Sequence, residues 1–234
     1  MNIQDIYTKR YSIDLSNQTF YAISEDKYND INIDDLEYEN IIVEVNEHID
    51  FSNNYNIKVI YFGMHLNQIN QKLDKLAPNL KELRFGDDFN QNVDSLSELK
   101  YLEYLSFGTH FNQQIDNLPS SLIDLKLGDE FNQNINNLPP NLQSLRLGSN
   151  FNKSIDNLPQ SLKLLTLECW FNQSLDNLPN SLEHLILDSY TFKHKVNVLP
   201  DNLENIYIKD HYDENDIRLT KLFNNKFIDR LKYF

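Results

Sequence analysis

The residues best suited to catalysis in this chain are its one cysteine and its six histidines. A thiol beside an imidazole can act as a nucleophile, because the imidazole removes the thiol proton. Cys169 and His184 are the candidate pair, but no third residue is placed to orient the imidazole. The histidines also lack the spacing to cysteine that zinc sites use. We therefore expect no catalytic residue, no metal site and no enzymatic activity.

A recurring set of aspartates is the next candidate for chemistry, because carboxylates bind Ca²⁺. The set comprises Asp94, Asp116, Asp156 and Asp176. Asn136 interrupts the set and no D-x-D cluster occurs, so a role in turns or caps is favoured. The five glycines do not form a phosphate loop. We expect no cofactor.

The charge of the chain excludes two classes of partner. Lys and Arg number 21 against 35 Asp and Glu, which gives a formal net charge of −14. Because nucleic acids and anionic membranes carry phosphate, an acidic surface repels both. One cysteine fits a reducing compartment, no apolar run approaches the roughly 18 residues of a membrane span, and the N-terminus has no secretory signal. These features predict a cytoplasmic protein.

A repeat of about 20 residues positions most of the apolar residues. An L-x-x-L-x-L triplet closes each unit, as in Leu142, Leu145 and Leu147. Pro follows the unit's earlier Leu in most copies, as in Leu138-Pro139. The phenylalanines that mark the repeat are Phe89, Phe111, Phe131, Phe151, Phe171 and Phe192.

Each unit predicts one short strand and a return path. Leu145 and Leu147 alternate with polar residues, which places them on one face of a strand. Gly148 then allows a tight turn with positive φ. The unit is too short for a crossover helix, so its convex side is irregular or 3-10 helical. Stacked coils bury what one coil exposes, and we expect a leucine-rich-repeat-like solenoid of about nine short parallel strands.

The two ends differ from the repeat and predict caps. Residues 1–35 are polar and read as an N-terminal cap, with a separate recruiting module as the alternative. Residues 36–212 form the solenoid. In residues 213–234 apolar side chains recur at helical spacing, which predicts a C-terminal capping helix. A helix that binds a partner or a membrane is the alternative, although its polar face is mixed and not basic.

Asparagine follows five of the repeat phenylalanines, at the bend that ends the strand. An amide can satisfy the backbone of its own turn and that of the next coil. We therefore expect a buried structural ladder made of Asn90, Asn112, Asn132, Asn152 and Asn172.

In the last strands, the outward positions hold more apolar and aromatic residues than in the earlier strands. The turns after these strands have no glycine, and one of them contains the only tryptophan of the sequence. Exposed Trp and Tyr are common anchors for protein partners. One hypothesis is therefore a partner-binding surface; the alternative is that these residues pack beneath the C-terminal helix or carry no function. The surface comprises Leu164, Thr166, Trp170, His184, Ile186, Tyr190 and Tyr207.

The unit Phe131-Asn132-Gln133-Asn134-Ile135-Asn136-Asn137-Leu138-Pro139, followed by the leucine triplet and Gly148, resembles the FNIP repeat. This leucine-rich-repeat-like family is known mainly from social amoebae and giant viruses of amoebae. The resemblance implies a non-enzymatic scaffold that binds another protein, located in the host cytoplasm if the protein is viral.

Two further functions remain open. Some family members carry an F-box and act as adaptors of a ubiquitin ligase, but residues 1–35 show no F-box sequence. A structural or self-associating protein, associated with a virion or with host interaction, is the other alternative. The partner and the oligomeric state are not determined by the sequence.

Overall fold

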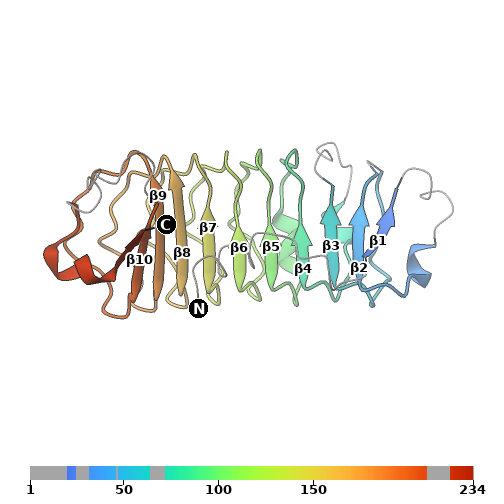
Figure 1. Cartoon of the computed structure of the whole chain (residues 1–234). Helices are drawn as coiled ribbons and strands as arrows, with labels where there is room; N and C mark the ends of the chain where they lie inside the picture. Colours follow the sequence, from blue (N-terminus) through green and yellow to red (C-terminus); the bar gives the residue numbers. More distant parts are fainter. Residues whose placement is uncertain (1–19, 25–31, 46, 64–71, 210–221, 234) are drawn as a thin grey trace.

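The computed structural model describes residues 20–24, 32–45, 47–63, 72–209 and 222–233. Over these residues the chain winds into coils that lie side by side in a row, each contributing one strand to a single parallel sheet (Figure 1). The strands follow the order of the sequence from β1 to β11. Their bounds are β1 Phe20–Ile23, β2 Asn40–Val43, β3 Val59–Phe62, β4 Glu82–Arg84, β5 Tyr104–Ser106, β6 Asp124–Lys126, β7 Ser144–Leu147, β8 Leu164–Cys169, β9 His184–Ser189, β10 Asn205–Ile208 and β11 Leu231–Tyr233.

The register of the sheet aligns the repeats. Leu125 pairs with Leu105 on one side and with Leu145 on the other, so equivalent residues of successive coils are neighbours. All three are fully buried. Because neighbouring parallel strands are about 4.8 Å apart, each leucine packs on the copies above and below it. The predicted leucine-rich-repeat-like solenoid is confirmed.

The repeat phenylalanines form a continuous stack through the core. The rings of Phe111, Phe131, Phe151 and Phe171 have centroids 6.2–6.3 Å apart and planes within 8° of parallel. Phe192 extends the stack at 6.4 Å. A second stack exists only in the early coils and consists of Phe62, Phe85 and Phe107, whose positions are occupied by leucine in β6 to β9 and by Ile208 in β10.

The convex side is built from turns and short 3-10 helices, as the repeat length predicts. Helices of this kind cover Ile33–Asp35, Leu73–Lys75, Asp94–Glu98 and Asn225–Arg230. In the later coils Pro begins a turn instead, and the amide N of Leu142 donates to the carbonyl O of Pro139 at 3.2 Å. Pro fits there because it needs no amide donor and its φ is already fixed.

The glycines that follow the strands differ from expectation. None of the described glycines has a positive φ, so the predicted left-handed turn at Gly148 is wrong. The coils approach too closely for a side chain: a Cβ atom on Gly108, Gly128 or Gly148 would lie 2.3, 1.7 or 2.4 Å from the carbonyl O of the preceding coil's glycine. Glycine is required here by backbone packing.

The last coils differ from the early ones in strand length. Strands β4 to β6 have three residues each, whereas β8 and β9 have six. The extra ladder pairs are Glu168 with Asp188 and Cys169 with Ser189. The strands lengthen where an acidic residue replaces glycine.

The strands at the two ends of the solenoid raise the number above the expected nine or so, and within the described residues the sheet has eleven strands. Strand β1 lies within the predicted N-terminal cap, whose residues 1–19 and 25–31 lie outside the described part of the chain. The predicted C-terminal helix is wrong for its described part, which holds a 3-10 helix and β11. Leu231 pairs with Ile206 of β10, and Phe223, Phe227 and Leu231 are buried, whereas Ile228 is 49% exposed. Residues 213–221 and 234 of that prediction lie outside the described residues.

Candidate interaction surface

The outward face of the sheet, here called the strand face, begins with a packed aromatic and charged cluster. The guanidinium of Arg84 lies between the rings of Tyr61 and Tyr104, 4.9 and 4.5 Å from their centroids. Arg84 Nε and the hydroxyl of Tyr61 each donate to Oε1 of Glu82 at 2.6 Å. Burial raises the pKa of Tyr104. Cation–π contacts and a half-buried ion pair make this cluster part of the packing.

Three of the seven residues predicted to bind a partner lie on the strand face and are buried. Leu164, Thr166 and Ile186 are 5%, 0% and 1% exposed. Thr166 and Ile186 are register partners on β8 and β9. The hydroxyl of Thr166 has no hydrogen-bond partner, which is a cost for a buried polar group.

Two more of the predicted residues lie next to each other on β9 and β10. The ring centroids of His184 and Tyr207 are 6.3 Å apart, and both side chains are half-buried. The Nδ2 atom of Asn205 lies 3.3 Å from Nδ1 of His184. Burial raises the pKa of the Tyr207 hydroxyl. These side chains form the accessible end of the strand face.

Two buried carboxylates lie where the strands lengthen. Glu168 pairs with Arg146, and Asp188 pairs with Nζ of Lys209 at 3.0 Å. Burial raises the pKa of Glu168, and the charge of Arg146 opposes that rise. The hydrogen bond to Asp188 raises the pKa of Lys209. The sequence alone shows that an acidic residue replaces glycine at these two positions. Which cation of a neighbouring coil pairs with each acid depends on the register of the strands.

The turns that follow β4 to β9 form a second surface, which we call the exit ridge. One outer residue per coil defines it: Asp88, His110, Glu130, Asn150, Trp170 and Tyr190. Backbone hydrogen bonds join successive turns, such as Glu130 N to Thr109 O at 2.9 Å and Trp170 N to Ser149 O at 3.0 Å. Its first three residues are ionisable, and its last two are aromatic. Trp170 is 55% exposed, and Tyr190 is half-buried.

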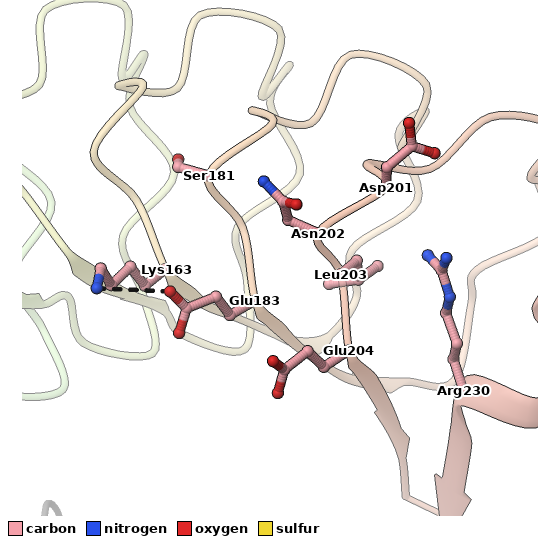
Figure 2. A pocket seen from close by; sticks show the side chains of 8 residues that line it. All are labelled: Lys163, Ser181, Glu183, Asp201, Asn202, Leu203, Glu204 and Arg230. Carbon is pink, nitrogen blue, oxygen red and sulfur yellow. Dashed lines mark ion pairs between the residues drawn. The ribbon is translucent and has the colours of Figure 1, made fainter.

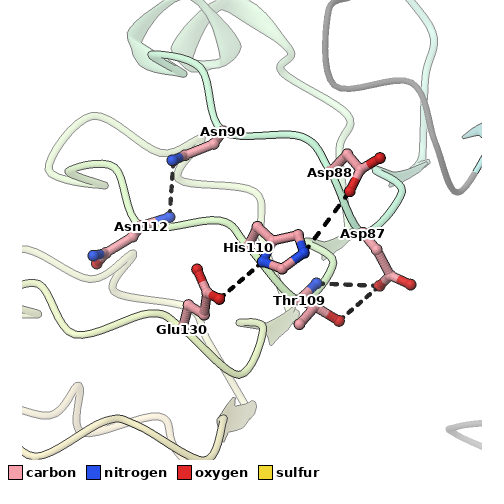
Figure 3. A network of polar contacts seen from close by, with 7 residues as sticks. All are labelled: Asp87, Asp88, Asn90, Thr109, His110, Asn112 and Glu130. Atoms are coloured by element: carbon pink, nitrogen blue, oxygen red, sulfur yellow. Dashed lines mark hydrogen bonds and ion pairs between the residues drawn. The ribbon is translucent and has the colours of Figure 1, made fainter.

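A histidine bridges the acidic half of the exit ridge (Figure 3). His110 Nδ1 lies 2.9 Å from Oε1 of Glu130, and Nε2 lies 3.8 Å from Oδ1 of Asp88. The hydrogen bond and charge of Glu130 raise the pKa of His110. One position earlier in the same turns, the amide N and the hydroxyl of Thr109 both donate to Oδ1 of Asp87.

The asparagine column forms hydrogen bonds from coil to coil. Oδ1 of Asn112 accepts from the amide N of Asn132 at 3.0 Å, and Oδ1 of Asn132 accepts from Asn152 N at the same distance. Asn90 and Asn152 also accept a side-chain bond from Gln113 and Gln173. The expectation that this column is buried is wrong, because Asn90 and Asn152 are exposed and the other three are half-buried. The Oδ1 atoms of this column therefore accept hydrogen bonds from backbone amides in turns at the protein surface.

The aspartates that sequence analysis considered for Ca²⁺ belong to a second column of this kind. Asn117 Nδ2 donates to Asp94 at 2.9 Å, and Asn177 Nδ2 donates to Asp156 at 2.9 Å. The hydrogen bond from Asn117 and a second one from Asn92 lower the pKa of Asp94. The bonds account for the recurrence of Asp and Asn as a link between coils.

The candidate nucleophile pair is separated. Cys169 ends β8, whereas His184 begins β9, and the register places Ser189 opposite Cys169. The five steps from His184 to Ser189 span about 17 Å of strand. Within the described residues, no group of three or more His, Cys, Asp or Glu side chains could hold a metal ion.

A hollow of about 630 Å³ lies on the opposite edge, where the last strands begin (Figure 2). Its lining includes the ion pair of Lys163 with Glu183, at 3.4 Å. Asp201 and Glu204 lie beside it, and Arg230 donates to the carbonyl O of Pro200 at 3.0 Å. The walls are polar and open to solvent. Sequence analysis missed this hollow, because Arg230 reaches it only through the position of β11.

One strand per coil and buried apolar side chains, mostly leucine, at each repeat define a leucine-rich-repeat-like β-solenoid. The family model described as FNIP Repeat matches residues 100–130, 131–169 and 171–211. Residues 100–211 of the chain therefore consist of sequences similar to the FNIP repeat.

Solved structures that are similar to the chain include CroV588 and an internalin. CroV588, a giant-virus protein described as a circular LRR protein, is 26% identical with a TM-score of 0.56. The match covers 85% of this chain and 38% of CroV588, so the chain spans well under half the length of that protein. The internalin InlF of Listeria monocytogenes is 17% identical with a TM-score of 0.43, and the match covers 68% of this chain and 51% of the internalin.

No curated protein matches the chain. Among the described residues, no helix has the length and apolar character needed to cross a membrane.

Proposed function

We propose that this protein is a non-enzymatic scaffold that binds another protein through the last coils of the solenoid. The observation that carries the proposal is Trp170, which is 55% exposed on the exit ridge beside β8. A large exposed aromatic side chain on a rigid surface is a common anchor for a partner. Folds with leucine-rich-repeat-like coils are typical protein-interaction scaffolds, which supports the general class.

The seven predicted residues divide into two roles in this proposal. Trp170, Tyr190, His184 and Tyr207 offer accessible surface on the ridge and on the strands next to it. The buried residues of the same set, Leu164, Thr166 and Ile186, support these strands from the strand face. A partner therefore contacts the ridge and the β9–β10 end of the face.

Photo-crosslinking from position 170 tests the proposal. A photoreactive phenylalanine analogue replaces Trp170 in one variant and Tyr101 in the control, since Tyr101 is 59% exposed on the opposite edge. In the native cell, we expect a discrete protein adduct from position 170 and none from position 101. Equal adducts from both positions, or none from position 170, would contradict the proposal.

The ubiquitin-ligase adaptor and the self-associating structural protein stay predictions. No feature of the described residues favours either over a simple scaffold. An adduct that contains a cullin or its adaptor would support the first, and an adduct with a second copy of this chain would support the second.

A further inference from the structure

The exit ridge offers a continuous surface whose two halves suit one kind of partner. Successive turns are joined by amide-to-carbonyl bonds, including Asn150 N to Asp129 O at 2.8 Å and Tyr190 N to Cys169 O at 2.9 Å. The outer side chains therefore follow one another at the spacing of the strands, about 4.8 Å. An extended segment that crosses the coils contacts each turn in order.

The first half of the ridge carries three acidic side chains that pair with no Lys or Arg among the described residues. Asp87, Asp129 and Glu130 form no ion pair with Lys or Arg within the part of the chain that the structure describes. Their polar contacts are with Thr109, with Ser149 and with His110. Those contacts leave carboxylate oxygens open to solvent. A cation from a partner would find acceptors here.

The second half of the ridge also favours a cation. The face of a tryptophan ring attracts Lys and Arg more strongly than other aromatic side chains do. Trp170 is the only tryptophan of the chain, and it lies two residues after the buried Glu168. The aliphatic stem of Lys or Arg packs on the same ring, so one side chain satisfies both the charge and the apolar surface.

Resting on the proposed scaffold function, we propose that the partner presents a basic extended segment to the exit ridge. Glu130 and Trp170 are two coils apart, which is about 10 Å. A segment in the extended polyproline II conformation rises about 3.1 Å per residue with three residues per turn, so it covers that distance in about three residues and returns a side chain to the same face. The partner's recognition segment therefore carries Lys or Arg side chains about three residues apart, one on the acidic half and one on Trp170.

Trp170 fluorescence provides the test, because no other tryptophan contributes to the signal. The probe is a synthetic peptide of about eight residues, or about 26 Å when extended, with Arg at every third position between Gly and Ser. The comparison peptide has Glu at each Arg position. We expect a saturable change in fluorescence with the Arg peptide only, weakened as salt rises. An equal response to the Glu peptide would overturn the proposal.

A matched pair of variants separates the ridge from the general attraction of an acidic protein. The ridge variant Asp129→Asn with Glu130→Gln keeps acceptors for Ser149 and His110. The control, Asp201→Asn with Glu204→Gln, removes the same charge from the opposite edge. We expect the ridge variant to weaken binding roughly 3- to 10-fold and the control to have less than about a 2-fold effect. Equal losses would show attraction by net charge alone and overturn the proposal.

Two outcomes distinguish this inference from the scaffold proposal. If position 170 crosslinks to a protein but the Arg peptide gives no saturable change, the scaffold stands and the basic segment is wrong. A fluorescence change that depends on protein concentration without any peptide would identify a second copy as the occupant, and it would also overturn the basic segment.

Discussion

The coils of β4–β7 and those of β8–β9 have the same core but different outer edges. In the early coils glycine follows the strand, the backbones touch, and the ladder ends after three or four residues. In the later coils Glu168 and Asp188 take that position and the ladder continues to six residues. The core alone therefore does not fix strand length. In β8 and β9 the longer ladder coincides with a residue that carries a Cβ atom in place of glycine, whereas β10 ends at Ile208 although Lys209 follows it.

The same division runs along the surface. The turns of the early coils are acidic and hydrogen-bonded to one another, whereas those of the later coils carry Trp170 and Tyr190. Longer strands with buried ion pairs give the later coils a supported edge from which an aromatic side chain projects. In a repeat protein, function resides on positions that the core leaves free.

The largest effect is expected at the glycine contact. Gly128→Ala places a Cβ atom 1.7 Å from the carbonyl O of Gly108, so the two backbones must separate. We expect a loss of about 3 kcal/mol in the free energy of unfolding, at the upper end for overpacking. Urea denaturation measures it. Asn150→Ala, an exposed change two residues after the next glycine, is the control and should cost less than about 0.5 kcal/mol. Equal costs would mean that the close contact does not limit the early coils.

A smaller effect is expected in the asparagine column. Asn132→Ala removes the Oδ1 atom that accepts from Asn152 N at 3.0 Å, and we expect a loss of about 1 kcal/mol in the free energy of unfolding. Asn132→Asp keeps an acceptor and serves as the control. Asn172→Ala should cost less, because its bond to Lys193 N is longer, at 3.2 Å. A thermal melt of Asn132→Ala that matches wild type would remove the column as a source of stability.

The smallest effect is a pH dependence in the later coils. Burial raises the pKa of Glu168, so the folded state binds this proton more tightly than the unfolded chain does. The stability contributed by the protonated carboxyl is present below its unfolded pKa of about 4.5 and is lost as pH rises through the folded pKa. The unfolding free energy of wild type, relative to Glu168→Gln, should therefore fall as pH rises above about 4.5. Parallel pH profiles of the two proteins would show that Glu168 titrates normally.

The core and the ridge differ in how far the sequence predicts them. The leucine triplets and Phe131 with its equivalents predict the solenoid, because a 20-residue return of apolar side chains can be buried only by stacking coils. The prediction of a C-terminal helix is wrong because apolar spacings of three to five residues fit a 3-10 turn and an edge strand as well as a helix. The segment that starts at Leu231 forms β11 because the unpaired edge of β10 offers it backbone hydrogen bonds.

The interaction surface was predictable only in part. The exposed Trp170 and the change from glycine to Glu168 are visible in the sequence. The burial of Thr166 and the distance between Cys169 and His184 are not, since alternation along a strand assigns a face but does not state how much solvent reaches it.

The order of residues is sufficient to specify the repeating core, because identical side chains at a constant interval stack on their own copies and need no distant partner. The edges are different. The glycine contacts, the ion pairs of Glu168 and Asp188 with cations of neighbouring coils, and the hydrogen bonds between asparagines all join atoms about 20 residues apart. Their energies depend on separations of a few tenths of an ångström. Those separations arise when the coils pack against one another, and no single repeat contains them.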